Sequence, residues 1–309
     1  MTGSPISHVS DTARWVAMYR AMESERPDAL FRDPLARALA GEHGEEIIRR
    51  LPKARQIAWP MIVRTAVMDE MILRAVHKDG ADTVVNLAAG LDARAYRLPV
   101  PPSVRWVDVD LPDIQRYKKS SLGGERPVCA LEYAPVDLTD AAARRALFAR
   151  IGASTKRVLV VTEGLLVYLK PDQVGDLAMD LHAQPAFRWW LIDIASPRLI
   201  KMLERTWGPS LERAPFLFAP ADSTRFFEPH GWKEAEYRSM FDESIRLNRT
   251  MRFGKFWHWV GRFYPRKMRE QFKRMSGVVV LERRTEQDGQ RRTRRTGERT
   301  GESGHHPGS

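Results

Sequence analysis

The 309-residue chain lacks several features that mark particular classes of protein. It has one cysteine, Cys129, so no disulfide can form within the chain, which suits a reducing compartment. No apolar run approaches the roughly 18 residues that a membrane-spanning helix needs. Residues 1–20 also lack the basic and then apolar pattern of a signal peptide. From these absences we expect a cytoplasmic globular protein.

Motifs of metal and nucleophile chemistry are absent as well. The chain has no HExxH or CxxC pattern, and its histidines do not have metal-ligand spacing, so we expect no metal. It has no GxSxG motif, and Cys129, in a predicted strand, fits a core position better than a nucleophile. The sequence therefore identifies no catalytic acid, base or nucleophile.

Acidic residues are too few to balance the basic ones. Fifty Lys and Arg residues stand against thirty-nine Asp and Glu residues, a net charge of +11. Residues 283–309 contain seven arginines and four acidic residues, a net charge of +3, so about +8 of the total belongs to the preceding residues. This balance favours an anionic partner, which could be an acidic small molecule, nucleic acid or a membrane surface. Residues 284–309 are polar and repetitive without an apolar anchor, which predicts a disordered tail.

Short β-rich runs alternate with helical stretches through the chain. The predicted helices are Thr12–Met22 with Asp11 as N-cap, Pro60–His77, Asp140–Ile151 and Pro171–His182. The predicted strands are Thr83–Leu87, Val104–Val109, Val128–Val136, Arg157–Thr162 and Trp189–Ala195, with two more at Trp232–Arg238 and Gly277–Glu282. Strands that are apolar throughout, such as VLVVT at 158–162, indicate burial on both faces of a parallel sheet. The order predicts a doubly wound, Rossmann-like α/β fold.

The end of the first predicted strand, in NLAAGLDARAYRL (86–98), is suited to binding a nucleoside. Ala88 and Gly90 are small enough to let a ligand approach the backbone at the carboxyl end of the strand. Asp110 ends the second strand, where an acid can accept hydrogen bonds from ribose hydroxyls. Asp92 would repel a pyrophosphate, whereas it suits a cofactor with sulfonium and ammonium groups, so S-adenosylmethionine is favoured over NAD. Alternatively, these residues bind no ligand and only form a tight turn between a strand and a helix beside an exposed acidic residue.

Four motifs in order carry a resemblance: NLAAGLDARAYRL (86–98), VDVDLPDIQRYK (107–118), VDL (136–138) and VTEGLLVYL (161–169). Together with the segment 12–36 they resemble the leucine carboxyl methyltransferase family, and more narrowly its bacterial branch of provisionally named S-adenosylmethionine-dependent methyltransferases. The similarity covers about residues 8–283. It implies a class I methyltransferase sheet at 81–283, a helical lid or cap at 1–80, and a helical insertion at about 241–275 before the last strand.

The resemblance also implies which residues bind S-adenosylmethionine. It assigns the cofactor carboxylate to Arg64, the methionine part to Ala88, Gly90 and Asp92, the ribose to Asp110 beside Leu111, the adenine to Asp137 and Leu138, and the methionine ammonium to Glu163. Many relatives carry glycine where this chain has Ala88, which narrows the approach of the cofactor. Without the family context, Arg64 would be a solvated charge on an amphipathic helix. Tyr168 is a candidate for the substrate pocket, or else an ordinary core or rim residue.

The expected chemistry needs no catalytic base. Methyl transfer from a sulfonium is an in-line displacement, and a carboxylate acceptor is already ionised at neutral pH, so the enzyme has only to align the reactants and exclude water. We therefore predict O-methylation of a carboxylate on a small, anionic metabolite or natural-product intermediate. A phenol or alcohol methyltransferase, which needs a base, stays open. So do a nucleic-acid methyltransferase, an NAD-dependent oxidoreductase and a non-catalytic cofactor-binding protein. The oligomeric state is not predicted.

The segment Arg249–Met275 is unusual in composition. It holds nine Lys and Arg residues, seven aromatic residues and one acid, Glu270. It could cap the substrate pocket, lie in a membrane interface through Trp257 and Trp259, or stack on single-stranded nucleic acid. Alternatively, it is an inserted helical pair with its aromatic residues in the core and its basic face in solvent.

Overall fold

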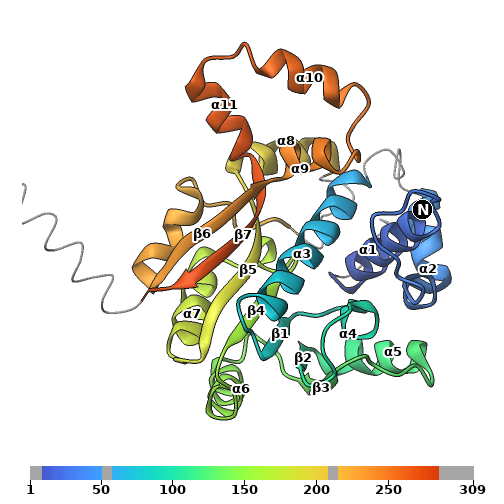
Figure 1. The fold of residues 1–309 in the computed structure, drawn as a ribbon, viewed down its shortest axis with the longest axis vertical. Helices are drawn as coiled ribbons and strands as arrows, with labels where there is room; N and C mark the ends of the chain where they lie inside the picture. Colours follow the sequence, from blue (N-terminus) through green and yellow to red (C-terminus); the bar gives the residue numbers. More distant parts are fainter. Residues whose placement is uncertain (1–8, 51–57, 208–214, 285–309) are drawn as a thin grey trace, which may run out of the picture.

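A seven-stranded sheet forms the centre of the computed structural model, which describes residues 9–50, 58–207 and 215–284 (Figure 1). The strands are β1 (Thr83–Leu87), β2 (Arg105–Asp110), β3 (Ala130–Pro135), β4 (Val158–Thr162), β5 (Phe187–Ala195), β6 (Trp232–Ser239) and β7 (Ser276–Arg283). They are arranged in the order β3-β2-β1-β4-β5-β7-β6, and only β7 runs antiparallel to its neighbours. All seven predicted strands are present, and the doubly wound α/β fold is confirmed.

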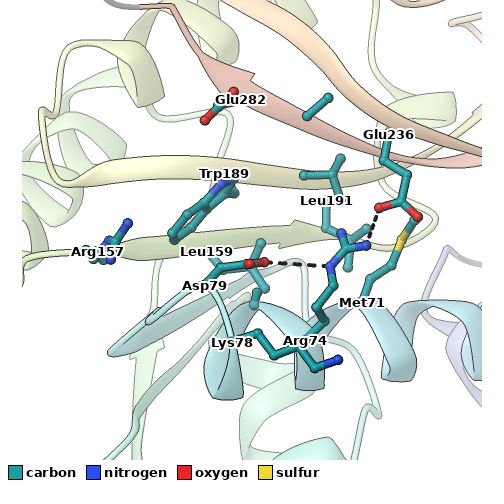
Figure 2. A pocket seen from close by; sticks show the side chains of 13 residues that line it. Met71, Arg74, Lys78, Asp79, Arg157, Leu159, Trp189, Leu191, Glu236 and Glu282 are labelled. Atoms are coloured by element: carbon teal, nitrogen blue, oxygen red, sulfur yellow. Dashed lines mark ion pairs between the residues drawn. The ribbon is translucent and has the colours of Figure 1, made fainter.

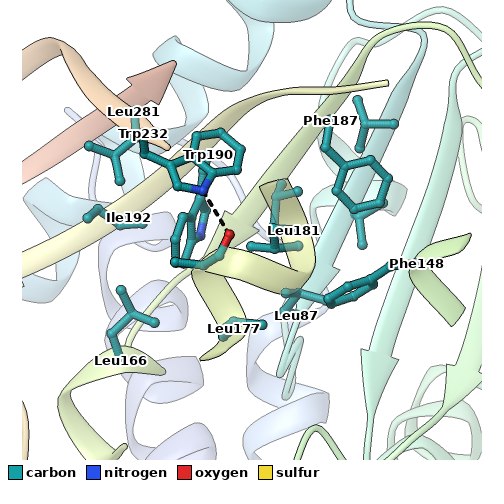
Figure 3. Close-up of a cluster of buried hydrophobic side chains, with 14 of the residues drawn as sticks. Leu87, Phe148, Leu166, Leu177, Leu181, Phe187, Trp190, Ile192, Trp232 and Leu281 are labelled. Carbon is teal, nitrogen blue, oxygen red and sulfur yellow. Dashed lines mark hydrogen bonds between the residues drawn. The ribbon is translucent and has the colours of Figure 1, made fainter. Parts of the chain in front are cut away.

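Apolar residues on both faces of the central strands explain why this sheet is buried between helices. Every residue of β1 and β4 is buried. Val84 belongs to the core on one face and Val85 to the core on the other, because neighbouring side chains of a strand point to opposite faces. Figure 3 shows the second of these cores, where Trp232 donates its indole N–H to the carbonyl of Ala178 at 2.9 Å.

Helices cover both faces and carry the connections. They are α1 (Val9–Ser24), α2 (Ala36–Arg50), α3 (Trp59–His77), α4 (Arg94–Arg97), α5 (Pro112–Leu122), α6 (Ala141–Ala153), α7 (Pro171–His182), α8 (Pro197–Trp207), α9 (Met240–Arg246), α10 (Gly254–Gly261) and α11 (Arg266–Lys273), with the 3-10 helices η2 (Leu166–Tyr168) and η4 (Ser223–His230). Residues of α3, α4 and α9 pack on one face of the sheet, and residues of α6, α7 and η4 pack on the other.

Two details of the N-terminal region differ from the prediction. Helix α1 begins at Val9, so Asp11 lies in its first turn and is not the N-cap; its carboxylate instead lies 3.1 Å from the ring of His43. Helix α2 was not predicted. Gly41 interrupts α2 with φ +62, which breaks the helical spacing of its apolar residues.

Two further expectations concern the surroundings of the protein. In the described ranges, no helix is both long and apolar enough to cross a bilayer. The expected disordered tail lies outside the described residues except for Arg284. The cytoplasmic location stays a prediction.

A buried ion pair joins α5 to β2. The Lys118 ammonium lies 2.7 Å from the Asp108 carboxylate, and both side chains are at most 2 % exposed. Trp106 also donates its indole N–H to Asp108 at 2.9 Å. Although burial raises the pKa of Asp108, the lysine opposes this effect. Each charge therefore depends on the other to stay buried.

We predict that Lys118→Met lowers the free energy of unfolding by about 3–5 kcal/mol, because it leaves the buried Asp108 carboxylate without its cation. Urea unfolding followed by far-UV circular dichroism measures this change. The neighbouring variant Lys119→Met is the control; its exposed ammonium lies over the ring of Tyr133 and should cost less than about 1 kcal/mol. Equal effects of the two variants would contradict the prediction.

Candidate functional site

Arg64 of α3 reaches the carboxyl edge of the parallel strands. Its Nε atom donates to Glu163, directly after β4, and its Nη1 atom donates to Asp193 near the end of β5, both at 3.0 Å. Asp193 also accepts the backbone N–H of Gly164 at 2.7 Å. The remaining Nη2 atom of Arg64 has no hydrogen-bond partner within the described ranges. One donor of this guanidinium is therefore open to an incoming carboxylate.

A second guanidinium, that of Arg94, connects the neighbouring elements. It donates to Glu163 at 2.6 Å, to Asp92 at 2.7 Å and to Asp69 of α3 at 2.6 Å. Its side chain is only 2 % exposed. Asn86 of β1 adds a hydrogen bond to Asp92 at 3.0 Å. Arg64 and Arg94 thus join α3, β1, β4 and β5 in one charged network.

This network keeps two of its carboxylates, those of Glu163 and Asp92, ionised. Burial favours the neutral form of Glu163, yet the charges of Arg94 and Arg64 together hold the pKa of this carboxyl group below its ordinary value. The same balance of burial against Arg94 holds the pKa of Asp92 well below the ordinary range. Proton acceptors with such low pKa values are poor bases.

The ends of β1 and β2 form a tight backbone loop around a third carboxylate. Asp110 accepts the N–H of Gly90 at 2.6 Å and the N–H of Leu111 at 2.7 Å. Burial raises the pKa of Asp110, and these two N–H groups oppose the rise. Ala88 and Gly90 both adopt left-handed backbone conformations, with φ +52 and +51, which turn the chain sharply away from β1.

The other predicted residues lie at the rim of this edge. Asp137 follows β3 and is exposed, and its carboxylate accepts the N–H and the hydroxyl of Thr139. Leu138 packs against the core below. Tyr168, in η2, stacks obliquely on Phe216 with the ring centroids 5.9 Å apart. Burial raises the pKa of Tyr168, and a hydrogen bond with Thr12 partly opposes this rise.

The structure thus gathers the predicted residues along one edge, but the network also contains residues that the sequence analysis missed. Arg94 lies within the motif that identified Ala88 and Gly90. Asp193 interrupts the apolar run of β5, as Glu163 follows that of β4. A carboxylate in an apolar strand needs a partner, and this is the signal by which Asp193 could have been found. The proposed roles of all these residues toward a cofactor stay predictions.

A cavity of about 620 Å³ lies elsewhere, at the opposite end of the strands (Figure 2). Arg157, which precedes β4, and Trp189, near the start of β5, line it, together with Arg74 of α3. Arg74 forms ion pairs with Asp79 and Glu236. Because open parallel sheets bind ligands at the carboxyl ends of their strands, we do not assign the cofactor to this cavity.

The fold and the comparisons together define a methyltransferase of the class I, Rossmann-like type that uses S-adenosylmethionine. The family model of leucine carboxyl methyltransferase matches residues 13–181, more than half of the chain. The chain belongs to this family.

Bacterial relatives carry the same activity in their names. A provisionally named S-adenosyl-L-methionine-dependent methyltransferase of Streptomyces coelicolor is 32% identical over 263 residues, which cover 79% of this chain and 90% of the relative. One from Streptomyces avermitilis is 30% identical, with the same shares of both chains covered. The resemblance stated from the motifs is thereby confirmed.

Solved structures support the fold at lower identity. A DUF574 family protein from Streptomyces avermitilis matches with a TM-score of 0.56 over 88% of this chain and 97% of its own, at 14% identity. A provisionally named methyltransferase from Thermobifida fusca matches with a TM-score of 0.53 over 87% of this chain and 95% of its own, also at 14% identity.

The described residues fit S-adenosylmethionine in charge and in hydrogen-bonding capacity. The open Nη2 donor of Arg64 suits its carboxylate, and the ionised Glu163 and Asp92 suit a sulfonium and an ammonium. Asp110 still has lone pairs free to accept ribose hydroxyls after it binds two N–H groups. These residues would hold the cofactor, which supplies the electrophilic methyl group.

We predict that Ala88→Gly raises the free energy of unfolding by about 0.5–1 kcal/mol, because glycine adopts φ +52 without the strain that alanine suffers there. Urea unfolding measures the change. Ala89→Gly is the matched control. Position 89 is not among the residues with positive φ, so glycine there should destabilise the protein by a similar amount. A loss of stability in both variants would contradict the assigned strain.

We predict that Asp110→Ala abolishes measurable binding of S-adenosylhomocysteine while the protein stays folded. Hydrogen bonds to a charged group contribute about 1.5–3 kcal/mol each, so losing those to the two ribose hydroxyls should lower the affinity at least about a hundredfold. Titration calorimetry measures affinity, and circular dichroism checks folding. Asp113→Ala, which removes a carboxylate that is exposed nearby on α5, should bind normally. If Asp110→Ala binds S-adenosylhomocysteine as tightly as the unchanged chain, the assignment of Asp110 to the ribose is wrong.

Proposed function

We propose that this methyltransferase transfers the methyl group to a carboxylate oxygen of a small, anionic acceptor. The observation that carries the proposal is the state of the carboxylates beside the candidate site. Glu163 and Asp92 have lowered pKa values, and Asp193 is held by Arg64 and the N–H of Gly164. Neither Glu163 nor Asp92 is therefore suited to deprotonate a hydroxyl. A carboxylate acceptor needs no deprotonation.

Tyr168 supports the same acceptor. Its raised pKa keeps the phenol protonated at neutral pH, so its hydroxyl can donate a hydrogen bond. The charge of Arg64 lies close enough to act on this phenol. A protonated phenol would help to orient an anionic acceptor by donating a hydrogen bond to it. The family name, which specifies a carboxyl group, points to the same chemistry.

Helix α1 supports the proposal that the N-terminal helices close over the site. Arg20 donates to the carbonyl of Leu91 at 2.6 Å, and Thr12 bonds to Tyr168. A Cβ atom at Gly90 would lie 3.4 Å from the Cβ atom of Ala13. Through these contacts α1 lies against the loop around Gly90 and against Tyr168. A lid there would exclude water from the reacting atoms.

The chemical stability of the product tests the proposal. We would incubate the protein with methyl-labelled S-adenosylmethionine and a panel of carboxylic acids, phenols and alcohols. We expect label that mild alkali releases as methanol, since esters hydrolyse and ethers do not. The kcat/KM for the acid should stay flat between about pH 6 and 9, because the acceptor is fully ionised there.

Other outcomes identify the alternatives. If the label is stable to alkali and is found on a phenol or alcohol, and if the rate of transfer rises with pH, the acceptor is a hydroxyl group and not a carboxylate. Label on an added oligonucleotide, lost steeply as salt is raised, would indicate nucleic-acid methylation. Saturable cofactor binding without turnover of any acceptor would support a binding protein.

A further inference from the structure

Helix α10 turns an aromatic face to solvent. Phe256, Trp259 and Val260 follow the i, i+3, i+4 spacing of one helix face, and Phe263 follows two residues after the end of the helix. The side chains of Phe256, Trp259 and Phe263 are 54%, 55% and 73% exposed. Of the thirteen large hydrophobic residues that are exposed in the described ranges, eight lie between Met251 and Phe272. The interpretation of this segment as a helical pair with aromatic residues in the core is therefore wrong.

The opposite side of α10 contacts α9 in the body of the protein. Gly254 is buried against the turn that precedes the helix, where a Cβ atom would lie 2.1 Å from the hydroxyl of Thr250. One turn later, the ring of His258 lies 5.9 Å from the ring of Phe241 in α9, and its Nε2 atom is 3.7 Å from Asp242. This orientation is the reverse of that in an ordinary surface helix, whose apolar face packs inward.

The same segment, including α11, also carries many exposed cations. The residues are Arg252, Lys255, Arg262, Arg266, Lys267, Arg269 and Lys273, and all are exposed. Within the described ranges none of these seven forms an ion pair. Figure 1 shows α10 and α11 as an arm that extends from the rest of the fold beyond α8 and α9. The arm thus combines unpaired positive charge with unburied aromatic surface.

An anionic lipid surface matches this combination best. Aromatic side chains insert at the boundary between headgroups and acyl chains, while basic side chains meet anionic headgroups. A second copy of the chain would bring two arms of equal positive charge together, which is unfavourable. Single-stranded nucleic acid stacks on open ring faces. Here Trp259 meets Phe263 edge to face at 5.2 Å, and Phe256 meets Trp257 in the same way at 5.6 Å, which gives a continuous apolar surface.

We propose that the arm formed by α10 and α11 is a peripheral docking surface for bilayers that contain anionic lipids. In sequence, the arm lies between β6 and β7 and leads directly into β7. Ser276, at the start of β7, pairs with Ala195 at the carboxyl end of β5. Docking therefore brings the candidate site's edge of the sheet to the lipid surface. The proposal does not depend on which acceptor is methylated.

Vesicle flotation with the purified full-length chain tests the proposal. We expect binding to vesicles with roughly a third phosphatidylglycerol in phosphatidylcholine, little binding to phosphatidylcholine alone, and loss of binding as salt is raised. Trp257→Ser should weaken partitioning roughly tenfold or more. Arg269→Glu should weaken it roughly fivefold or more.

Matched variants elsewhere on the surface distinguish binding through the arm from binding caused by the overall charge or by any exposed apolar side chain. Met179→Ser removes an apolar side chain from α7 that is 50% exposed, and Arg145→Glu reverses a charge in α6 that is 61% exposed. Both variants should partition like the unchanged chain. Because every variant retains residues 285–309, the basic tail contributes equally in all of them. Circular dichroism verifies that each variant is folded.

Three results would overturn the proposal. The first is no flotation with anionic vesicles, or equal flotation of the arm and control variants. The second is binding of a single-stranded oligonucleotide that Trp257→Ser abolishes, without vesicle binding. The third is a dimer, measured by light scattering, that the arm variants dissociate while vesicles leave it unchanged.

Discussion

The pairing of buried Arg94 with three carboxylates is the interaction on which the candidate site depends. Asp69 comes from α3, Asp92 from the turn after β1 and Glu163 from the end of β4, so each partner belongs to a different element. Removing one partner of a buried ion pair costs about 3–5 kcal/mol. Any displacement of these elements would leave a charge uncompensated, and the edge of the sheet is therefore held in one arrangement.

The composition of the network also leaves room for a cationic cofactor. Its four guanidinium groups are those of Arg20, Arg64, Arg94 and Arg97, and its five carboxylates are those of Asp33, Asp69, Asp92, Glu163 and Asp193. One carboxylate is in excess, which a sulfonium would balance. Folding lowers the pKa of Glu163 and Asp92. Their ion pairs therefore stabilise the protein above the ordinary carboxyl pKa, and this contribution disappears as pH falls through the lowered values.

The sheet could be predicted from the sequence because its strands are apolar on both faces, a pattern that few other structures produce. Gly90 and Asp110 were predicted because small residues and an acid at strand ends have a direct chemical meaning. Arg94 was not, because the sequence does not show that its partners come from α3 and β4. Pairing across three elements is a property of the tertiary structure. Helix α2 was missed for a local reason, the left-handed Gly41 within it.

Helix α10 shows a different limit of sequence analysis. Its spacing identifies an aromatic face, but spacing alone cannot say whether that face meets the core or a partner outside the chain. The contact of His258 with Phe241 and Asp242 of α9 decides the question, because it fixes which side of the helix meets the body. Once His258 faces inward, helical geometry turns Phe256 outward. The exposed aromatic face is thus a consequence of how the helix is attached to α9.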